Sequence, residues 1–250
     1  MNTFAVAELF HLLFLEHLSK RCAQNLFALK GGCNLRFYFK SIRYSEDIDI
    51  DVHTVSVMTL QSNVRKILKS KAFIDTLRSR DIEIAATSEP KQTQTTQRWK
   101  IALRLQGIGR EFQTKVEFSR RDETTGATIQ PIDPDIIGHY KLYPIHFFHY
   151  TREQAISQKI TALIGRSQTQ ARDVFDLSLL SREGRNAMAQ PLSPEKVDKA
   201  YEHLQSLSFD DFKAQVIAFL MPEYLRYYDN AAVWKELVAN VTDMIRGSRE

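Results

Sequence analysis

The strictest constraint on the fold of this chain is a short run of alternating charged and branched apolar residues, Asp47-Ile48-Asp49-Ile50-Asp51-Val52. Side chains of a β-strand point alternately to its two faces, so the run predicts a strand over residues 46–52. Two carboxylates about 5 Å apart on one face repel each other by roughly 3 kcal/mol at an effective dielectric of about 20, so they must share protons or hold a cation. Their oxygen atoms suit Mg²⁺ or Mn²⁺. A solvated strand edge is the alternative interpretation.

A glycine pair, Gly31 and Gly32, precedes this strand. It lies between an apolar run at residues 26–29, predicted to be a strand, and a predicted helix at residues 34–39. Glycines at a strand-to-helix turn let backbone N–H groups approach a phosphate, and the helix N-terminus adds a favourable dipole. An ordinary tight turn explains the pair alone. Together with the acidic strand, it favours a site for a metal-bound phosphate.

Two sequence blocks carry a family resemblance, Leu29-Lys30-Gly31-Gly32 and Arg43-Tyr44-Ser45-Glu46-Asp47-Ile48-Asp49. Their order resembles the AbiEii/AbiGii toxin nucleotidyltransferases of the polymerase-beta-like nucleotidyltransferase superfamily. The resemblance implies that Gly31 and Gly32 contact phosphate and that Asp47 and Asp49 bind metal. We add Cys33, Arg43 and Ser45 to the nucleotide-binding candidates. The family usually has Ser or Thr where this chain has Cys33; a thiol is a weaker hydrogen-bond donor, although backbone amides could still act.

A third carboxylate comes from a predicted hairpin. Residues 98–106 and 111–120 alternate as paired strands, joined by a turn at Gly107-Ile108-Gly109. Glu117 then shares a strand face with Lys115 and Ser119. The resemblance implies that Glu117 binds the catalytic metal or takes the proton from the attacking hydroxyl. A surface glutamate on a half-exposed strand is the alternative.

A second motif combines two predicted helices. The first begins at Thr151, which has capping-box spacing to Gln154, and it places Lys159 and Arg166 seven residues apart on the rim of an apolar stripe. Both cations can therefore reach one anionic ligand. On the second helix, Asp173 or Asp176 could orient these cations by charge-assisted hydrogen bonds.

The same family resemblance extends to this second motif. It implies that Lys159 contacts the nucleotide phosphate, that Arg166 contacts the triphosphate or the substrate, and that Asp173 and Asp176 are catalytic-site or supporting acids. Salt bridges between helices are the structural alternative.

The fold class that we expect is α+β, a nucleotidyltransferase-type mixed β-sheet flanked by helices and followed by a C-terminal helical bundle. Residues 1–150 would form the catalytic domain, and residues 151–250 a helical domain that contributes nucleotide-binding residues. We also predict one helix over residues 60–78, an exposed polar loop over residues 88–97 and a helix over residues 209–220.

Composition indicates the size of the core, the kind of partner and the cellular compartment of the protein. The 250 residues are 43% hydrophobic, enough for a sizeable core, and a net charge of +4 permits a polyanionic partner. Two cysteines, Cys22 and Cys33, form no paired framework, which suits a reducing cytosol. Charged residues interrupt the apolar segment at residues 4–18, so we expect neither a targeting peptide nor a membrane span, and a cytoplasmic protein. No DNA-binding motif is recognised.

The sequence thus predicts an enzyme that transfers a nucleoside monophosphate from a nucleoside triphosphate to a hydroxyl group, with Mg²⁺ or Mn²⁺ bound by Asp47, Asp49 and Glu117. Lys159 joins these three acids as a catalytic candidate. The resemblance implies a toxin of a bacterial toxin–antitoxin or abortive-infection system, with a cognate antitoxin and with tRNA 3′ ends as an acceptor class.

Two alternatives stay open for the function. One is an enzyme acting on a small-molecule or protein hydroxyl, and the other is a nucleotide-binding regulatory module without turnover, which Cys33 makes credible. Eight Lys or Arg against two Glu at residues 91–121 could receive an RNA backbone, and a solvated strand face explains them almost as well.

Overall fold

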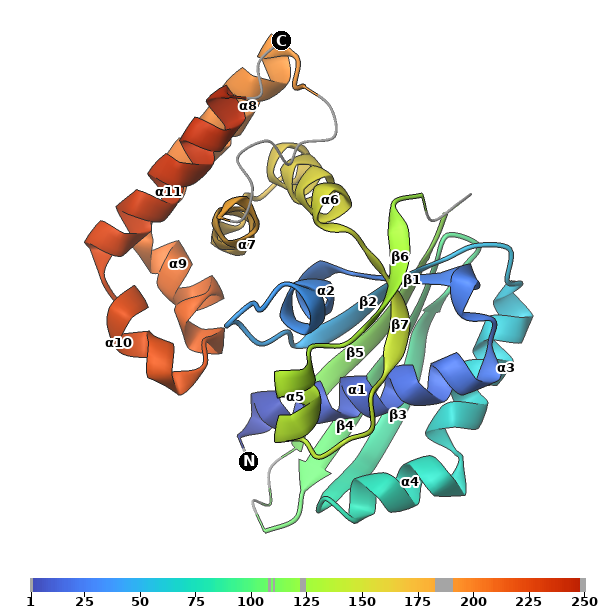
Figure 1. Cartoon of the computed structure of the whole chain (residues 1–250). Helices are drawn as coiled ribbons and strands as arrows, with labels where there is room; N and C mark the ends of the chain where they lie inside the picture. The colour runs from blue at the N-terminus through green and yellow to red at the C-terminus, as the bar shows by residue number, and fades with distance from the viewer. Residues whose placement is uncertain (1, 108, 110, 122–124, 183–190, 248–250) are drawn as a thin grey trace. The chain divides into compact units, whose positions relative to one another are not determined.

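The chain divides into two compact units in the computed structural model (Figure 1). The described residues are 2–107, 109, 111–121, 125–182 and 191–247. The first unit comprises residues 1–40 and 44–150, and the second comprises Ser41–Arg43 and Thr151–Glu250. Over the described ranges, the search for a helix long and apolar enough to cross a membrane found none.

The first unit is built on a seven-stranded sheet in the order β3-β4-β5-β2-β1-β7-β6. Its strands are β1 (Phe27–Lys30), β2 (Asp47–Val52), β3 (Ile82–Gln92), β4 (Thr96–Leu105), β5 (Glu111–Arg120), β6 (Ala127–Pro131) and β7 (His146–Tyr150). The pairs β2–β5 and β1–β7 are parallel, and the other pairs are antiparallel. The sheet is therefore mixed, and the predicted α+β class is confirmed. The acidic strand β2 lies at its centre.

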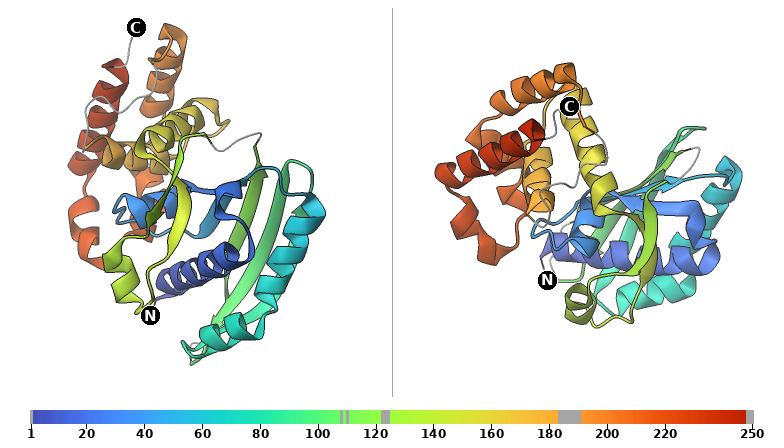
Figure 2. Two further views of the ribbon diagram at one scale, coloured as in Figure 1. Left: turned by 45° about the vertical axis from the view of Figure 1, so that its right-hand side comes forward. Right: turned by 45° about the horizontal axis from the view of Figure 1, so that its top comes forward.

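One face of the sheet forms the core of this unit. Ile48, Ile50 and Val52 of β2 are fully buried, as the alternating run predicts. Phe118 of β5 contacts Phe14 of α1 at 6.5 Å between ring centroids. The helices α1 (Thr3–Arg21), α3 (Val57–Leu68) and α4 (Lys71–Arg78) lie over this face (Figures 1 and 2). The opposite face carries the charged side chains of β2 and β5.

The turn from β1 into α2 (Gly31–Tyr38) differs from the prediction. The helix begins at Gly31, three residues earlier than expected, because the chain changes from strand to helix at Gly31 itself and no loop lies between β1 and α2. Lys30 is still extended at φ −135°, and Gly31 has φ +66°, which favours glycine. The first amides of α2 therefore follow directly on the end of the central sheet.

Three other predicted elements are corrected. The helix expected at residues 60–78 is two helices, because Ser70 accepts a hydrogen bond from the Phe73 amide and starts α4. The loop expected at residues 88–97 is mostly strand, since β3 runs to Gln92 and β4 starts at Thr96; its polar residues reflect an exposed edge strand. The helix expected at residues 209–220 stops at Gln215 and continues as a 3₁₀ turn.

The second unit is helical. Its helices are α6 (Arg152–Gly165), α7 (Ala171–Ser181), α8 (Pro194–Gln205), α9 (Phe209–Gln215), α10 (Leu225–Tyr228) and α11 (Ala231–Arg246), with 3₁₀ turns at Ile217–Phe219 and Pro222–Tyr224. Phe212 and Trp234 stack in its core at 4.8 Å between ring centroids. The short segment at residues 41–43 joins this unit through a bridge from Arg43 to Leu220 and a Met221 amide that donates to the Ile42 carbonyl. The first unit also holds α5 (Pro134–His139) and a 3₁₀ turn at Gln24–Leu26.

Candidate active site

The predicted carboxylates meet on the charged face of the first unit. In the sheet register, Asp49 of β2 pairs with Glu117 of β5, and Asp47 pairs with Lys115. Neighbouring strands lie about 4.8 Å apart, so Asp49 and Glu117 are side by side on one face. The expectation that a later strand brings a third acid to this face therefore holds in the geometry, while the catalytic roles stay predictions.

Gly31 brings the start of α2 against this acidic face. A Cβ atom added to Gly31 would lie 3.2 Å from Oδ2 of Asp49, closer than nine in ten Cβ contacts in proteins. Position 31 therefore favours glycine for two reasons: its φ is positive, and the Asp49 side chain lies where a Cβ atom would need space. The first turn of a helix has N–H groups without intrahelical acceptors. A phosphate bound to the amides of Gly31 and Gly32 would lie beside the Asp49 carboxylate.

Lys115 is a basic residue within the acidic cluster, and we did not assign it a role from the sequence. Its Nζ lies 3.1 Å from Oδ2 of Asp47 and 3.7 Å from Oε2 of Glu117. Nε of Arg98 lies 2.6 Å from the same Glu117 oxygen. Burial lowers the pKa of Lys115, but Asp47 and Asp49 outweigh burial and the pKa is raised. The signal was its two-residue spacing from Glu117 on one strand face.

The environment of Asp49 disfavours the charged form of its carboxyl group. Burial, with Glu117 and Asp47 nearby, raises the pKa of the Asp49 carboxyl against the opposing effect of Lys115 and Lys30. Within the described residues, no group of three or more His, Cys, Asp or Glu side chains is placed to hold a metal ion as it stands. Lys115 and Arg98 instead hold the Asp47 and Glu117 carboxylates.

The donor set nevertheless fits a hard divalent cation. Asp47, Asp49 and Glu117 supply carboxylate oxygens, the ligands that Mg²⁺ and Mn²⁺ prefer. The Asp47 side chain is 37% exposed and Lys115 is the cation that contacts it. A metal ion could replace that ion pair without opening the core.

The Cys33 side chain points into the first unit and contacts the start of β2. It is 1% exposed, and its thiol donates to the Asp47 carbonyl at 3.3 Å. The Ser45 hydroxyl donates to the same carbonyl at 2.8 Å. The thiol is thus engaged inside the protein, which agrees with the expectation that Cys33 is a weaker phosphate donor than the family's Ser or Thr. The phosphate contact predicted for Cys33 is left to its backbone amide.

A buried histidine completes this support. Thr114 donates its hydroxyl to the Glu46 carbonyl at 2.7 Å and also lies 2.7 Å from Nε2 of His11. Burial lowers the pKa of His11 to about 3, so the ring is neutral at pH 7. Since the threonine proton goes to Glu46, Nε2 of His11 carries the ring proton and donates to Thr114. The remaining ring nitrogen, Nδ1, lies 3.6 Å from the Cys33 sulfur. Thr114 and Cys33, which both lie beside His11, thus hold the backbone carbonyls of Glu46 and Asp47 at the start of β2.

Asp51, the third aspartate of the run, is structural. It is 2% exposed and accepts hydrogen bonds from Nζ of Lys30 at 2.5 Å and from the Tyr150 hydroxyl at 2.8 Å. These bonds connect β2 to β1 and β7. The alternating run therefore supplies two candidate ligands and one buried anchor.

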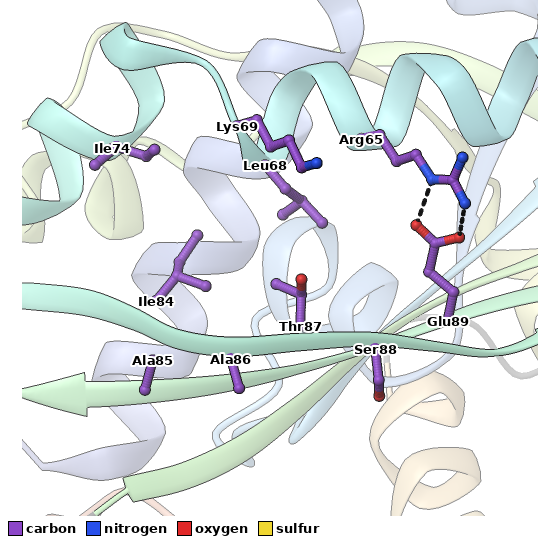
Figure 3. A pocket seen from close by; sticks show the side chains of 10 residues that line it. All are labelled: Arg65, Leu68, Lys69, Ile74, Ile84, Ala85, Ala86, Thr87, Ser88 and Glu89. Carbon is purple, nitrogen blue, oxygen red and sulfur yellow. Dashed lines mark hydrogen bonds and ion pairs between the residues drawn. The ribbon is translucent and has the colours of Figure 1, made fainter.

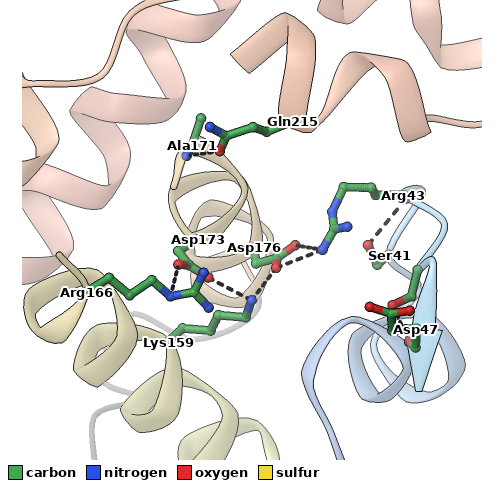
Figure 4. Close-up of polar contacts among 10 residues, drawn as sticks. Ser41, Arg43, Asp47, Lys159, Arg166, Ala171, Asp173, Asp176 and Gln215 are labelled. Carbon is green, nitrogen blue, oxygen red and sulfur yellow. Dashed lines mark hydrogen bonds and ion pairs between the residues drawn. The ribbon is translucent and has the colours of Figure 1, made fainter. Parts of the chain in front are cut away.

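The second motif forms a buried ion-pair network in the second unit (Figure 4). Nζ of Lys159 lies 2.6 Å from Oδ2 of Asp176 and 3.0 Å from Oδ1 of Asp173. Nε of Arg166 lies 3.4 Å from the other Asp173 oxygen, which has no hydrogen bond. Asp176 also accepts from Arg43 at 3.1 Å. The acids orient the cations, as the helical spacing suggested.

The charge balance of this network favours an anion. Asp173 and Asp176 are fully buried, and three cations surround them. Burial raises the pKa of Asp176, but Arg43 and Lys159 outweigh burial and the pKa is lowered. One positive charge is in excess, and Lys159 keeps a third N–H donor. Arg43, predicted with Ser45 as nucleotide-binding, belongs to this unit, whereas Ser45 belongs to the first.

Comparisons with known proteins identify a family and a shared fold. The family model described as "Nucleotidyl transferase AbiEii toxin, Type IV TA system" matches residues 13–237. JHP933 from Helicobacter pylori is similar in structure, with 18% identity, a TM-score of 0.62, and coverage of 99% of this chain and 95% of that chain. MenT4, a nucleotidyltransferase toxin from Mycobacterium tuberculosis, has 15% identity, a TM-score of 0.59, and coverage of 100% and 96%. At these identities the structures show the shared fold alone. No curated protein matched the chain.

Proposed function

Because the chain belongs to the AbiEii family of nucleotidyl transferase toxins of type IV toxin–antitoxin systems, we propose that it transfers a nucleoside monophosphate from a nucleoside triphosphate to a hydroxyl group of RNA. That it is a nucleotidyltransferase follows from the family. The Mg²⁺ dependence, the nucleotide-binding residues and the tRNA 3′ end as acceptor are the proposal. The family implies an antitoxin partner, and the expected cytoplasmic location stays a prediction.

The protein groups divide the chemistry between them. The amides of Gly31 and Gly32 bind phosphate oxygens at the N-terminus of α2, and Lys159 and Arg166 bind further phosphate oxygens. Asp47, Asp49 and Glu117 would hold Mg²⁺, which would supply positive charge to the oxygens that become negative during the transfer. The acceptor oxygen forms a bond to the α-phosphorus and the bond to pyrophosphate breaks. The hydroxyl proton goes to water or, where Glu117 is not a metal ligand, to the Glu117 carboxylate.

A row of side chains across the sheet carries the proposal of an RNA acceptor. Asp49, Glu117, Arg98 and Lys91 are successive register partners on β2, β5, β4 and β3. A parallel row runs from Asp47 through Lys115 and Lys100. At about 4.8 Å per strand, positive charge extends roughly 15 Å from the acids toward the sheet edge. A polyanionic backbone matches such a strip, whereas a small-molecule acceptor would leave it unused.

The experiment is a transfer assay with the purified protein, Mg²⁺, each labelled nucleoside triphosphate in turn, and total tRNA. We expect label on tRNA. Raising the salt concentration from about 50 to about 200 mM should weaken the binding of tRNA by about 10-fold or more, because salt weakens contacts between basic side chains and phosphates, and labelling should fall accordingly. Label on protein alone, or no label, contradicts the RNA acceptor.

A charge-reversal variant tests the strip of positive charge formed by Lys115, Lys100, Arg98 and Lys91. Lys100→Glu should reduce labelling of tRNA because it reverses the charge on an exposed residue of the strip. Lys199→Glu, an exposed residue of α8 that carries the same charge change, is the matched control. Equal activity of the two variants would remove the strip from the argument.

A further inference from the structure

The first unit holds a cavity of about 700 Å³ that shares no residue with the candidate active site (Figure 3). It is lined by the C-terminal end of α3, by Ile74 of α4 and by residues 84–89 of β3. Its volume falls in the range of about 300–1,000 Å³ that is typical of ligand sites. The proposed transfer reaction gives this cavity no role.

The cavity follows the open edge of the sheet. β3 is the outermost strand and pairs with β4 alone among the described strands. Ile84, Thr87 and Glu89 point toward α3 in Figure 3, whereas Ala85, Ala86 and Ser88 point away from it. Both sets line the cavity, so the cavity reaches past the strand edge, where backbone groups face outward. The small side chains at residues 85–88 leave this edge accessible.

The lining combines an apolar floor with a free positive charge. Leu68, Ile74 and Ile84 supply aliphatic surface. Arg65 is occupied by two hydrogen bonds to Glu89, both 2.7 Å long, which also neutralise that acid. Lys69 lines the cavity as well and forms no ion pair with any residue that the structure describes. Since Arg65 and Glu89 neutralise each other, Lys69 leaves the lining with one positive charge, and the cavity is complementary to negative charge.

We propose that this cavity binds an extended segment of a partner protein, added to the sheet as a strand beside β3. Side chains two residues apart in an extended segment face the same way. One aliphatic side chain would contact the apolar floor, and an acidic side chain two positions away would pair with Lys69. The backbone of the segment would bond to the β3 edge, a known mode of peptide recognition. A nucleic acid would use Lys69 but neither the apolar floor nor the strand edge.

A displayed library of random twelve-residue peptides, selected on the full chain, tests this proposal. The enriched sequences should contain an aliphatic and an acidic residue two positions apart. A synthetic peptide of the enriched sequence is then measured by fluorescence anisotropy. Methylation of single backbone nitrogens should weaken binding at every second position, because alternate amides face β3.

Two exposed lysines at the C-terminal end of α3, Lys66 in its last turn and Lys69 directly after it, give a matched pair of variants. Lys69→Glu should weaken binding of the peptide by about tenfold, the value of one charge-assisted contact. Lys66→Glu carries the same charge change three residues earlier in the chain but does not line the cavity, and it should leave binding unchanged. Both variants should keep the melting temperature of the natural chain, since each side chain is exposed.

Several outcomes overturn the proposal. Among them are a library without enrichment, binding that tolerates every methylated amide, and equal effects of the two lysine variants. A dimer of the full chain that Lys69→Glu dissociates would show instead that a second copy occupies the edge. None of these readouts depends on nucleotide transfer, so this proposal and the proposed function can fail separately.

Discussion

The two charged clusters of this protein differ in the sign of their excess charge. On the sheet face of the first unit, Asp47, Asp49 and Glu117 outnumber Lys115 and Arg98, and the pKa of Asp49 is raised. In the second unit, three cations surround two buried acids, and the pKa of Asp176 is lowered. The first cluster therefore has acidic groups in excess, and the second has cations in excess.

The largest expected effect is on folding, at Asp176. Asp176→Asn removes the charge that Arg43 and Lys159 share, and breaking a buried ion pair costs about 3–5 kcal/mol. We expect a large drop in the urea midpoint of unfolding. The control is Asp210→Asn, which breaks an exposed pair with Lys213 that is worth less than about 1 kcal/mol. Equal midpoints for the two variants would show that the second cluster is not a structural network.

The next effect separates activity from folding. Asp47→Asn should reduce nucleotide transfer by about 100-fold to 1,000-fold, as when one charged group is lost from a transition state. The circular dichroism spectrum should be unchanged, because Asp47 is 37% exposed. Asp51→Asn is the comparison within the same strand, and there we expect lost stability, since Asp51 is a buried anchor. Full activity of the Asp47 variant would refute the metal assignment.

The pH dependence of stability should have opposite signs in the two clusters. The folded-state pKa of Asp176 is below its unfolded value, so its contribution is complete above about pH 4 and is lost as pH falls through the folded pKa. The folded-state pKa of Asp49 is raised, so its ionised form destabilises the fold at neutral pH, and the penalty is relieved as pH falls through that pKa. Asp49→Asn should therefore raise the urea midpoint at pH 7 without metal, whereas Asp176→Asn lowers it.

A smaller effect tests the approach of Gly31 to the acids. Gly31→Ala should cost about 1–2 kcal/mol from the positive φ, plus the contact of the new Cβ with Asp49. Gly107→Ala is the matched control, because Gly107 also has positive φ and no atom lies within 4 Å of a Cβ there. The difference between the two urea midpoints measures the contact alone. An equal loss would mean that Asp49 moves away freely.

The smallest effect concerns Cys33. Cys33→Ser keeps a donor to the Asp47 carbonyl, while Cys33→Ala removes one hydrogen bond, worth about 1 kcal/mol. We expect the alanine variant to need more Mn²⁺ for half-maximal binding, measured by electron paramagnetic resonance, and the serine variant to restore the natural value. If the thiol contacted phosphate instead, nucleotide affinity would change and Mn²⁺ affinity would not.

Local patterns predicted the elements that hold the site. The alternation of residues in β2 predicted that Ile48 and Ile50 are buried, and the alternation in β5 predicted which face of the sheet carries Glu117. The break at Ser70 and the continuation of the edge strand β3 over residues 88–92 were not predicted, since both depend on what the segment packs against. The Thr and Gln residues near the β3–β4 turn are typical of a loop, and they occur in these strands because the side chains there are largely exposed to solvent.

The sequence by itself determined which residues share a face, because side-chain alternation and helical spacing are properties of the local backbone. Only the tertiary structure decided which partner each charge has. Register pairs Asp47 with Lys115 and Asp49 with Glu117, burial makes Asp51 an anchor, and packing turns Cys33 inward against Asp47. Pairing register and burial are set by contacts between residues far apart in the chain, and no short motif encodes them.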